Sequence, residues 1–168
     1  MGRTLVLYHA NCLDGFTAAW AVYRALGSVA TYQPVNYGEP APGPEQIGRR
    51  HVILVDFSYP RAALDAMASV ATSVAVFDHH KTAKADLDGW TRGQVTFDME
   101  RSGAGIAWDE FHHNVPQPML VQFVQDRGLW RWKVPDSREI SEYLVSLEQT
   151  FPVWDAAAKE LTITTSYD

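Results

Sequence analysis

The chain has 168 residues, of which 46% are hydrophobic and 12% aromatic, and its formal net charge is -6. This length and composition suffice for one domain with a full hydrophobic core. The negative charge argues against broad electrostatic binding to long duplex nucleic acid or to a membrane surface, so a polyanionic substrate is expected to be small. With a single cysteine and neither a signal-peptide pattern nor a long apolar run, the sequence predicts a soluble, cytoplasmic protein.

The N-terminal part of the sequence alternates short apolar runs with segments of helical composition. Strands are expected over residues 4–8, 29–37, 51–55, 73–77 and 94–97, and helices over 16–26 and 61–70. Pro34 cannot donate a hydrogen bond to a neighbouring strand, which favours a place near a sheet edge for the second run. This alternation predicts an α/β fold: a doubly wound, mainly parallel five-stranded sheet with helices on both faces.

The C-terminal third of the sequence is predicted to be helical. Helices are expected over residues 106–113, 116–132 and 137–147, and the segment 153–161 closes the chain. Ser102 is expected to cap the first of these helices and Ser137 the third. The sequence has no repeat, and its Pro/Gly-rich stretch at 38–44 is too short for an interdomain linker. Residues 1–168 are therefore interpreted as a single domain.

Acids and imidazoles follow three of the predicted strands at the point where each strand ends. These residues are His9, Asp14, Asp56, Asp78, His79 and His80. Because the carboxyl ends of parallel strands line the ligand crevice of an open sheet, we expect the side chains to meet there. Uncompensated carboxylates would repel one another, and a divalent cation removes that conflict. Mixed carboxylate and imidazole ligands suit manganese, iron, cobalt or zinc better than magnesium or calcium.

Two features of the sequence also have simpler interpretations. Each acid after a strand is equally suited to cap the helix that follows, in which case the chain would be an α/β domain without a functional metal. Trp130 and Trp132 flank Arg131. They are interpreted either as a stacking site for a base or as packing residues at a helix end.

The ordered motifs resemble those of the DHH phosphoesterases, which include RecJ-type nucleases, nanoRNases, cyclic-dinucleotide phosphodiesterases and family II inorganic pyrophosphatases. The Asp-His-His motif of that family is similar to Asp78-His79-His80, and its strand-terminal acid to Asp56. The resemblance runs from about residue 5 to residue 147. It is greatest for the branch of oligoribonuclease-like phosphohydrolases, and it implies the catalytic domain of such a protein.

Two further segments carry the resemblance, and one departs from it. The segment 124–130 is similar to an acid-bearing helix of the branch, with Asp126 as the acid and Gly128 in place of a second one. The turn at Ser102-Gly103 matches a small-residue turn before a helix. In the first motif, His followed by Asp-x-Asp, Cys12 stands where the first acid belongs. A thiolate binds soft or borderline metals well and manganese poorly.

The resemblance implies a centre for one or two divalent ions, with manganese the expected metal. One ion would be held by Asp14, Asp56, His79 and Asp126. The other would be held by His9, Cys12 and Asp56, so that Asp56 bridges the two.

The resemblance also implies roles for the neighbouring residues. A water made acidic by the ions would be the nucleophile, His80 would contact the scissile phosphate, and Asp78 would orient an imidazole. The expected substrate contacts are Asn11, Lys81, Arg101, Ser102 and Gly103.

The function implied is hydrolysis of a small phosphodiester or phosphoanhydride, such as a short oligonucleotide or a cyclic nucleotide. Family members that act on nucleotides usually add a smaller C-terminal substrate-binding domain, which has no counterpart in this sequence. The part that selects the substrate is then either absent or supplied by a second copy of the chain or by a partner chain. The alternative is a catalytically weakened relative that binds a nucleotide or a metal and acts as a sponge or sensor.

Overall fold

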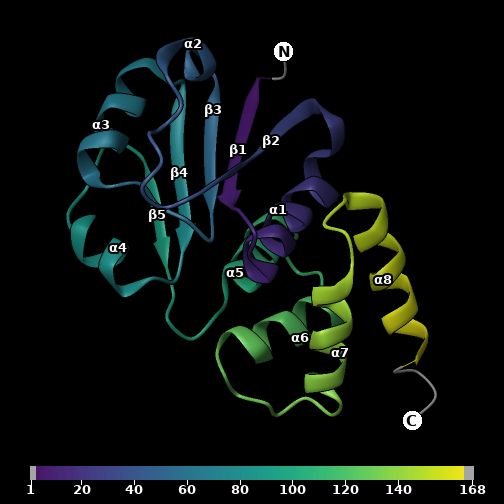
Figure 1. The fold of residues 1–168 in the computed structure, drawn as a ribbon. Coiled ribbons are helices and arrows are strands. Elements are labelled where there is room, and N and C mark those ends of the chain that lie inside the picture. The colour runs from purple at the N-terminus through teal and green to yellow at the C-terminus, as the bar shows by residue number, and fades with distance from the viewer. Residues whose placement is uncertain (1–2, 165–168) are drawn as a thin grey trace.

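A parallel sheet organises the computed structural model, which describes residues 3–164 (Figure 1). Within these residues its strands are β1 (Thr4–His9), β2 (Ala30–Val35), β3 (His51–Val55), β4 (Ser73–Asp78) and β5 (Gln94–Phe97). They lie in the order β2-β1-β3-β4-β5, and all neighbours run parallel. The predicted α/β fold with a parallel five-stranded sheet is confirmed, and Pro34 lies on an edge strand as expected.

Helices connect the strands and form the C-terminal third. The helices of the described residues are α1 (Leu13–Leu26), α2 (Pro44–Ile47), α3 (Arg61–Val70), α4 (Lys81–Asp86), α5 (Gly103–Phe111), α6 (Met119–Gly128), α7 (Ser137–Ser146) and α8 (Phe151–Thr164). None of these helices is long and apolar enough to span a membrane. The sequence analysis did not predict the short helices α2 and α4.

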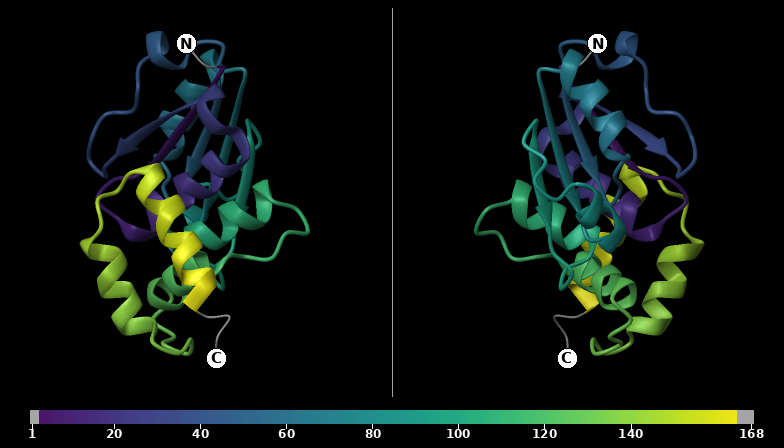
Figure 2. Two further views of the ribbon diagram at one scale, coloured as in Figure 1. Left: turned by 90° about the vertical axis from the view of Figure 1, so that its right-hand side faces the viewer. Right: turned by 90° about the vertical axis from the view of Figure 1, so that its left-hand side faces the viewer.

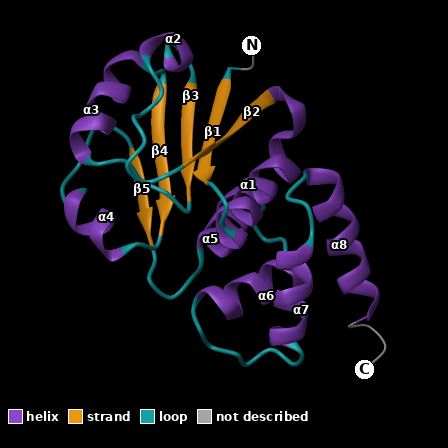
Figure 3. Ribbon diagram, viewed as in Figure 1, coloured by secondary structure: helices purple, strands orange, loops and turns teal. Residues whose placement is uncertain are grey.

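The two faces of the sheet are covered by different helices (Figure 3). Helices α2 and α3 pack on one face, together with Leu87 and Trp90 of the segment that follows α4, and α1 and α5 pack on the other. Helices α6 and α8 pack in turn against α1, and α7 packs against α6. Figure 2 shows this helical group at the opposite end of the molecule from α2.

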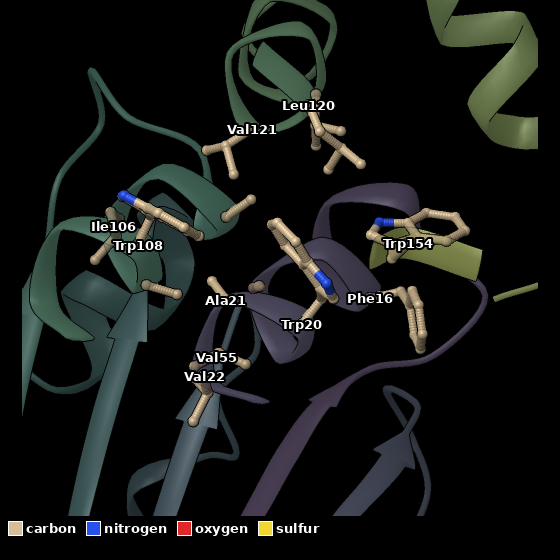
Figure 4. Packing of buried hydrophobic residues seen from close by; sticks show 14 of the residues in the cluster. Phe16, Trp20, Ala21, Val22, Val55, Ile106, Trp108, Leu120, Val121 and Trp154 are labelled. Carbon is tan, nitrogen blue, oxygen red and sulfur yellow. The ribbon is translucent and has the colours of Figure 1, made fainter. Parts of the chain in front are cut away.

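Alternating side chains of each strand supply the two cores. Val6 lies in the cluster under α1 and α5, whereas its neighbours Leu5 and Leu7 lie in the cluster under α2 and α3. A strand buried on both faces is apolar at every position, which is why the predicted strands were continuous apolar runs. Tryptophans fill the larger core, where Trp20 stacks on Trp108 at a centroid distance of 5.7 Å (Figure 4).

The strand order reverses between β1 and β3. The chain leaves β1 into α1 on one face and leaves β3 towards α3 on the other. The two connections therefore diverge at the carboxyl ends of these adjacent strands. In open α/β sheets, ligands bind in the crevice at such a switch point.

Candidate metal centre

Asp56 lies at the centre of this crevice. It directly follows β3 in a left-handed conformation, φ 53°, and its amide donates to the carbonyl of Phe77 on β4 over 3.0 Å. Its side chain is almost fully buried, with the residue 1% exposed. The backbone therefore fixes the position of a carboxylate that has little access to water.

Two groups of ligand atoms share Asp56. His9, Cys12 and Asp56 bring potential ligand atoms within 4.8 Å of one another, and so do Asp56, His79 and His80. In the first group the Asp56 Oδ2 atom lies 3.6 Å from Cys12 Sγ and 3.8 Å from His9 Nδ1. In the second, Asp56 Oδ1 lies 3.2 Å from His79 Nε2. Each carboxylate oxygen of Asp56 thus faces a different group.

Asp14 joins the edge of the second group from the start of α1. Its Oδ2 atom lies 3.5 Å from His79 Nε2. Its carboxylate also accepts hydrogen bonds from the amides of Gly103 and Ala104, over 2.9 and 2.7 Å. These are the first amides of α5, where the helix dipole favours a negative charge. A single carboxylate therefore ties together α1, α5 and the imidazole of His79.

The start of α5 packs tightly against the centre. A Cβ atom built on Gly103 would lie 2.4 Å from the Cβ of Asp56. Only glycine allows the backbone of α5 to approach Asp56 this closely. Ser102 caps the same helix through a hydrogen bond from the amide of Gly105 to its hydroxyl, at 3.2 Å, as the sequence predicted.

Burial and charge shift the protonation of these groups. Burial, followed by the charge of Asp56, raises the pKa of Asp14 to about 7. Burial opposes ionisation of Asp56 as well, but His79 and His9 outweigh it, so the pKa of Asp56 lies below its ordinary value. Asp56 in turn raises the pKa of His79. The negative charge of the carboxylates in the centre is therefore compensated by protons that its own residues bind.

His80 and Asp78 form a coupled pair next to the centre. The carboxylate of Asp78 is fully buried and lies 2.6 Å from His80 Nδ1; it also accepts a hydrogen bond from the amide of His79 at 2.8 Å. The hydrogen bond with Asp78 raises the pKa of His80. Because the carboxylate occupies the Nδ1 side, the Nε2 atom of His80 is directed elsewhere.

The donor set fits a divalent cation. Among the described residues, seven buried side-chain nitrogen and oxygen atoms lack a hydrogen-bond partner, and His9 Nδ1 and Asp56 Oδ1 are two of them. Buried polar atoms in native proteins rarely lack a partner, and those that do indicate an ion or water that satisfies them. Both atoms belong to the ligand groups around Asp56. Carboxylate, imidazole and thiol ligands suit a transition metal or zinc.

Asp126, which the sequence analysis expects to hold an ion, belongs to neither of the two ligand groups. Its Oδ1 accepts from the amide of Lys133 at 2.9 Å, and its Oδ2 from that of Val134 at 3.2 Å. Both oxygens therefore hold the loop between α6 and α7. Gly128 of the same segment does border the centre, since its ideal Cβ would lie 3.7 Å from Asp14 Oδ2.

Replacing Asp126 with asparagine is expected to lower the free energy of unfolding by about 1–3 kcal/mol at neutral pH, because an amide cannot accept from both backbone donors. Although burial acts in the opposite direction, the hydrogen bond from the Lys133 amide helps to lower the pKa of Asp126. The carboxylate thus stabilises the fold above its unfolded pKa, and this stabilisation is lost as the pH falls through its folded pKa.

Urea unfolding at pH 7 and at lower pH measures this effect. The difference between the parent chain and Asp126→Asn should narrow as the pH falls below about 4. Asp136→Asn is the matched control, because Asp136 is an exposed carboxylate at the end of the same loop and makes no capping hydrogen bond with its side chain. An equal loss of stability in both variants would contradict the assigned role.

Some of the predicted substrate contacts are already bonded to other residues of the protein, and the others are not. Arg101 is held by Asp98 and Asp109, over 2.7 and 2.8 Å. The amide of Ser102 donates to Gln125 at 3.1 Å, and that of Gly103 donates to Asp14. These donors are therefore occupied by the protein itself, contrary to the expectation that they receive phosphate.

The other two predicted contacts are open. Within residues 3–164, no hydrogen bond or ion pair engages the side chains of Asn11 and Lys81, and both are exposed. Asn11 lines a cavity of about 370 Å³ beside the centre. The other residues that line the cavity are His9, Ala10, Cys12, Leu13, Asp14, Val124, Arg127 and Gly128.

Sequence reasoning missed Tyr37. Its ring lies edge-on to that of His9 at a centroid distance of 5.2 Å, and 6.1 Å from that of His80. Burial, and then the charge of Asp78, raises the pKa of its hydroxyl. The sequence analysis placed Tyr37 inside the second strand, over residues 29–37, whereas β2 ends at Val35 and Tyr37 lies two residues beyond it.

The fold and the site define a class: a parallel α/β domain with carboxylates and imidazoles grouped as a candidate cation centre at the carboxyl ends of its strands. No family model matches the chain. It is 30% identical over 177 residues to "Uncharacterized protein R106" of Acanthamoeba polyphaga mimivirus, an alignment that covers 98% of this chain and 42% of that protein.

Two solved structures are similar to the chain. One is exonuclease RecJ bound to manganese, at 20% identity and a TM-score of 0.52, with 89% of this chain and 49% of that chain covered. The other is RecJ in complex with Mn²⁺ from Thermus thermophilus, at 20% identity and a TM-score of 0.48, with 73% and 21% covered. The first shows that the chain has the fold of part of a manganese-bound exonuclease. The chain spans less than half the length of each of these three proteins.

Proposed function

We propose that the chain is a metal-dependent phosphohydrolase that cleaves a small phosphodiester or phosphoanhydride. The observation that carries this proposal is the sharing of one buried carboxylate, Asp56, by two groups of ligand atoms. Two ions bridged by one acid form a recurrent arrangement in phosphatases and nucleases. The motifs that resemble DHH phosphoesterases and the fold in common with manganese-bound RecJ support the same conclusion.

The ligand residues divide between two proposed cation positions. His9, Cys12 and Asp56 would hold one ion; Asp56 and His79, with Asp14 beside them, would hold the other. Manganese is the expected metal. A bound divalent cation supplies Lewis-acid chemistry, because it makes water more acidic and offsets the charge on phosphate.

His80 is the proposed proton carrier of the site. Its bond to the buried Asp78 keeps a proton on Nδ1 and raises its pKa. Its side chain is 37% exposed, so its Nε2 atom is accessible to a substrate. A protonated His80 would donate from Nε2 to an oxygen of the scissile phosphate, and Asp78 would stabilise the imidazolium. Lys81 and Asn11 would contact other oxygens of the same phosphate.

The proposed substrate is a short oligonucleotide, a cyclic nucleotide or a related small phosphate ester in the cytoplasm. The net charge of -6 supports a small ligand over a long duplex. We also propose that a second copy of the chain or a partner chain contributes to the selection of a substrate.

Hydrolysis of a chromogenic phosphodiester tests the proposal. The chain is first stripped of metal with a chelator, and product release is then measured with and without Mn²⁺. We expect turnover only with the metal and a loss of turnover in His79→Ala, since His79 lies within 3.2 Å of Asp56. Absence of metal-stimulated turnover, together with no effect of His79→Ala on metal binding, would reject the proposal.

A second candidate function is storage or sensing of a nucleotide or metal without turnover. Cys12 favours it, because burial and then the charge of Asp56 raise the pKa of its thiol to about 11. A thiol that keeps its proton weakens one ligand group at neutral pH. Metal stoichiometry separates the two functions: two ions with product formation support the enzyme, whereas one ion or none with tight nucleotide binding and no product supports the sensor.

A further inference from the structure

We propose that Trp130 is a stacking platform for a base of the substrate, and that Arg127 receives a phosphate of the same nucleotide. This inference rests on the proposed function and narrows its substrate to a nucleotide or short oligonucleotide, in preference to a phosphate ester without a base. The relevant part of the chain is the end of α6 and the loop at 129–136.

Trp130 is unusual among the tryptophans of the chain. Trp20, Trp90, Trp108 and Trp154 are all buried, whereas Trp130 is 76% exposed. Exposed aromatic rings are the side chains on which bases stack in sites for single-stranded nucleic acid.

The loop that presents Trp130 is fixed by hydrogen bonds. Trp130 and Trp132 both have left-handed backbones, with φ of 55° and 51°. Such conformations are unfavourable for bulky residues and persist where the surroundings determine them. Here the amide of Trp130 donates to the carbonyl of Arg127, and that of Arg131 to the carbonyl of Asp126, both over 2.9 Å. The platform is therefore held before any ligand arrives.

Trp132 and Arg138 support the exposed indole from one side. The ring of Trp132 contacts that of Trp130 edge-on, at a centroid distance of 5.1 Å and an angle of 74°. The guanidinium of Arg138 lies over Trp132, 4.7 Å from its centroid. This packing orients Trp130 and leaves most of its surface to solvent.

The backbone of the segment that carries Trp130 lies close to the metal centre. Gly128, two residues before Trp130, has its ideal Cβ 3.7 Å from Asp14 Oδ2. Successive Cα atoms are about 3.8 Å apart, so the Cα of Trp130 lies within about 8 Å of that of Gly128. A nucleotide spans this kind of separation through its sugar, with its phosphate at one end and its base at the other.

Arg127 supplies a positive charge between Trp130 and the metal centre. It lines the same cavity as His9, Asn11, Cys12 and Asp14. Within residues 3–164 no hydrogen bond or ion pair engages its guanidinium, whereas the neighbouring Arg131 is bonded to Glu100. An arginine whose guanidinium is available beside the metal centre can bind a phosphate that the ions of the centre also attract.

Binding of a hydrolysis-resistant dinucleotide tests this inference. A phosphorothioate-linked dinucleotide is titrated into the parent chain, Trp130→Ala and Trp130→Phe in the presence of Mn²⁺. The same backbone without its bases is the second ligand. We expect Trp130→Ala to weaken dinucleotide binding by about 5-fold to 150-fold, as the loss of one stacked base implies. Trp130→Phe should restore most of the affinity, and the abasic ligand should bind all three chains alike.

The control variant is Tyr143→Ala, which removes another exposed aromatic side chain, on α7, and should leave dinucleotide binding unchanged. Arg127→Gln should weaken the abasic ligand and the dinucleotide by the same factor, since it removes a phosphate contact. Equal binding of the dinucleotide to the parent and Trp130→Ala would overturn the inference, as would absence of dinucleotide binding to the parent. In that case, hydrolysis of the chromogenic phosphodiester by the parent chain would show that the proposed function is correct although the inference about Trp130 is not.

Discussion

Asp56→Asn is expected to reduce metal-dependent hydrolysis by about 1,000-fold or more, in line with the removal of a central charge-stabilising group. The same variant should weaken divalent-cation binding at both positions at once. Asp56 is the residue common to both ligand groups, with one oxygen towards Cys12 and His9 and the other towards His79. Asparagine keeps the shape of the side chain and loses its charge.

The affinity for Mn²⁺ and the titration of His79 report this change independently of activity. In the metal-free protein, the pKa of His79 should fall towards its ordinary value, because Asp56 is the main cause of its increase. His79→Ala should lower metal binding at one position only. A loss of hydrolysis with unchanged Mn²⁺ affinity and an unchanged His79 titration would contradict the bridging role of Asp56.

Cys12→Asp is expected to raise the affinity for Mn²⁺ by about tenfold or more, equivalent to about 1.4 kcal/mol, and to raise Mn²⁺-dependent turnover with it. The thiol of Cys12, with its pKa near 11, must lose a proton before it can bind an ion. A carboxylate at this position is already ionised at neutral pH and presents the oxygen ligand that manganese prefers.

Cobalt spectroscopy shows whether the sulfur is a ligand. The parent chain loaded with Co²⁺ should show a sulfur-to-cobalt charge-transfer band that is absent from both Cys12→Asp and Cys12→Ser. Cys12→Ser is the matched control, because it removes the sulfur without adding a charge, and it should not gain affinity for Mn²⁺. A fall in Mn²⁺ affinity in Cys12→Asp would show that repulsion from Asp14 and Asp56 outweighs the added ligand.

The sheet was predictable because its signal is local. β3, β5 and α3 have the predicted bounds, since each is a sharply limited apolar or amphipathic segment. Short polar helices were harder to predict. Helix α4 contains two lysines and an aspartate and has no buried residue, so no apolar periodicity marks it as a helix. The cap of α7 was displaced by one residue, because Asp136 takes the N-cap position in a left-handed conformation and Ser137 begins the helix.

The site was predictable where it depends on strand ends. His9, Asp56 and His79 follow parallel strands, so the fold alone brings them together. Asp126 and Arg101 are on helices and loops, where the direction of a side chain depends on partners distant in sequence. Asp126 reaches backbone amides of the next loop, and Arg101 reaches Asp109 on α5. A motif records the type of residue at such a position but not the atoms that it contacts.

The contact between Gly103 and Asp56 determines where the centre can adapt. Because Gly103 leaves no space for an added methyl group and the amide of Asp56 is bonded to Phe77, the position of Asp56 is fixed. Cys12 and Asn11, by contrast, belong to the partly exposed turn between β1 and α1. Ions of different radius would then be accommodated by shifts of that turn, so exchange of one metal for another should alter the environment of Cys12 and leave that of Asp56 unchanged.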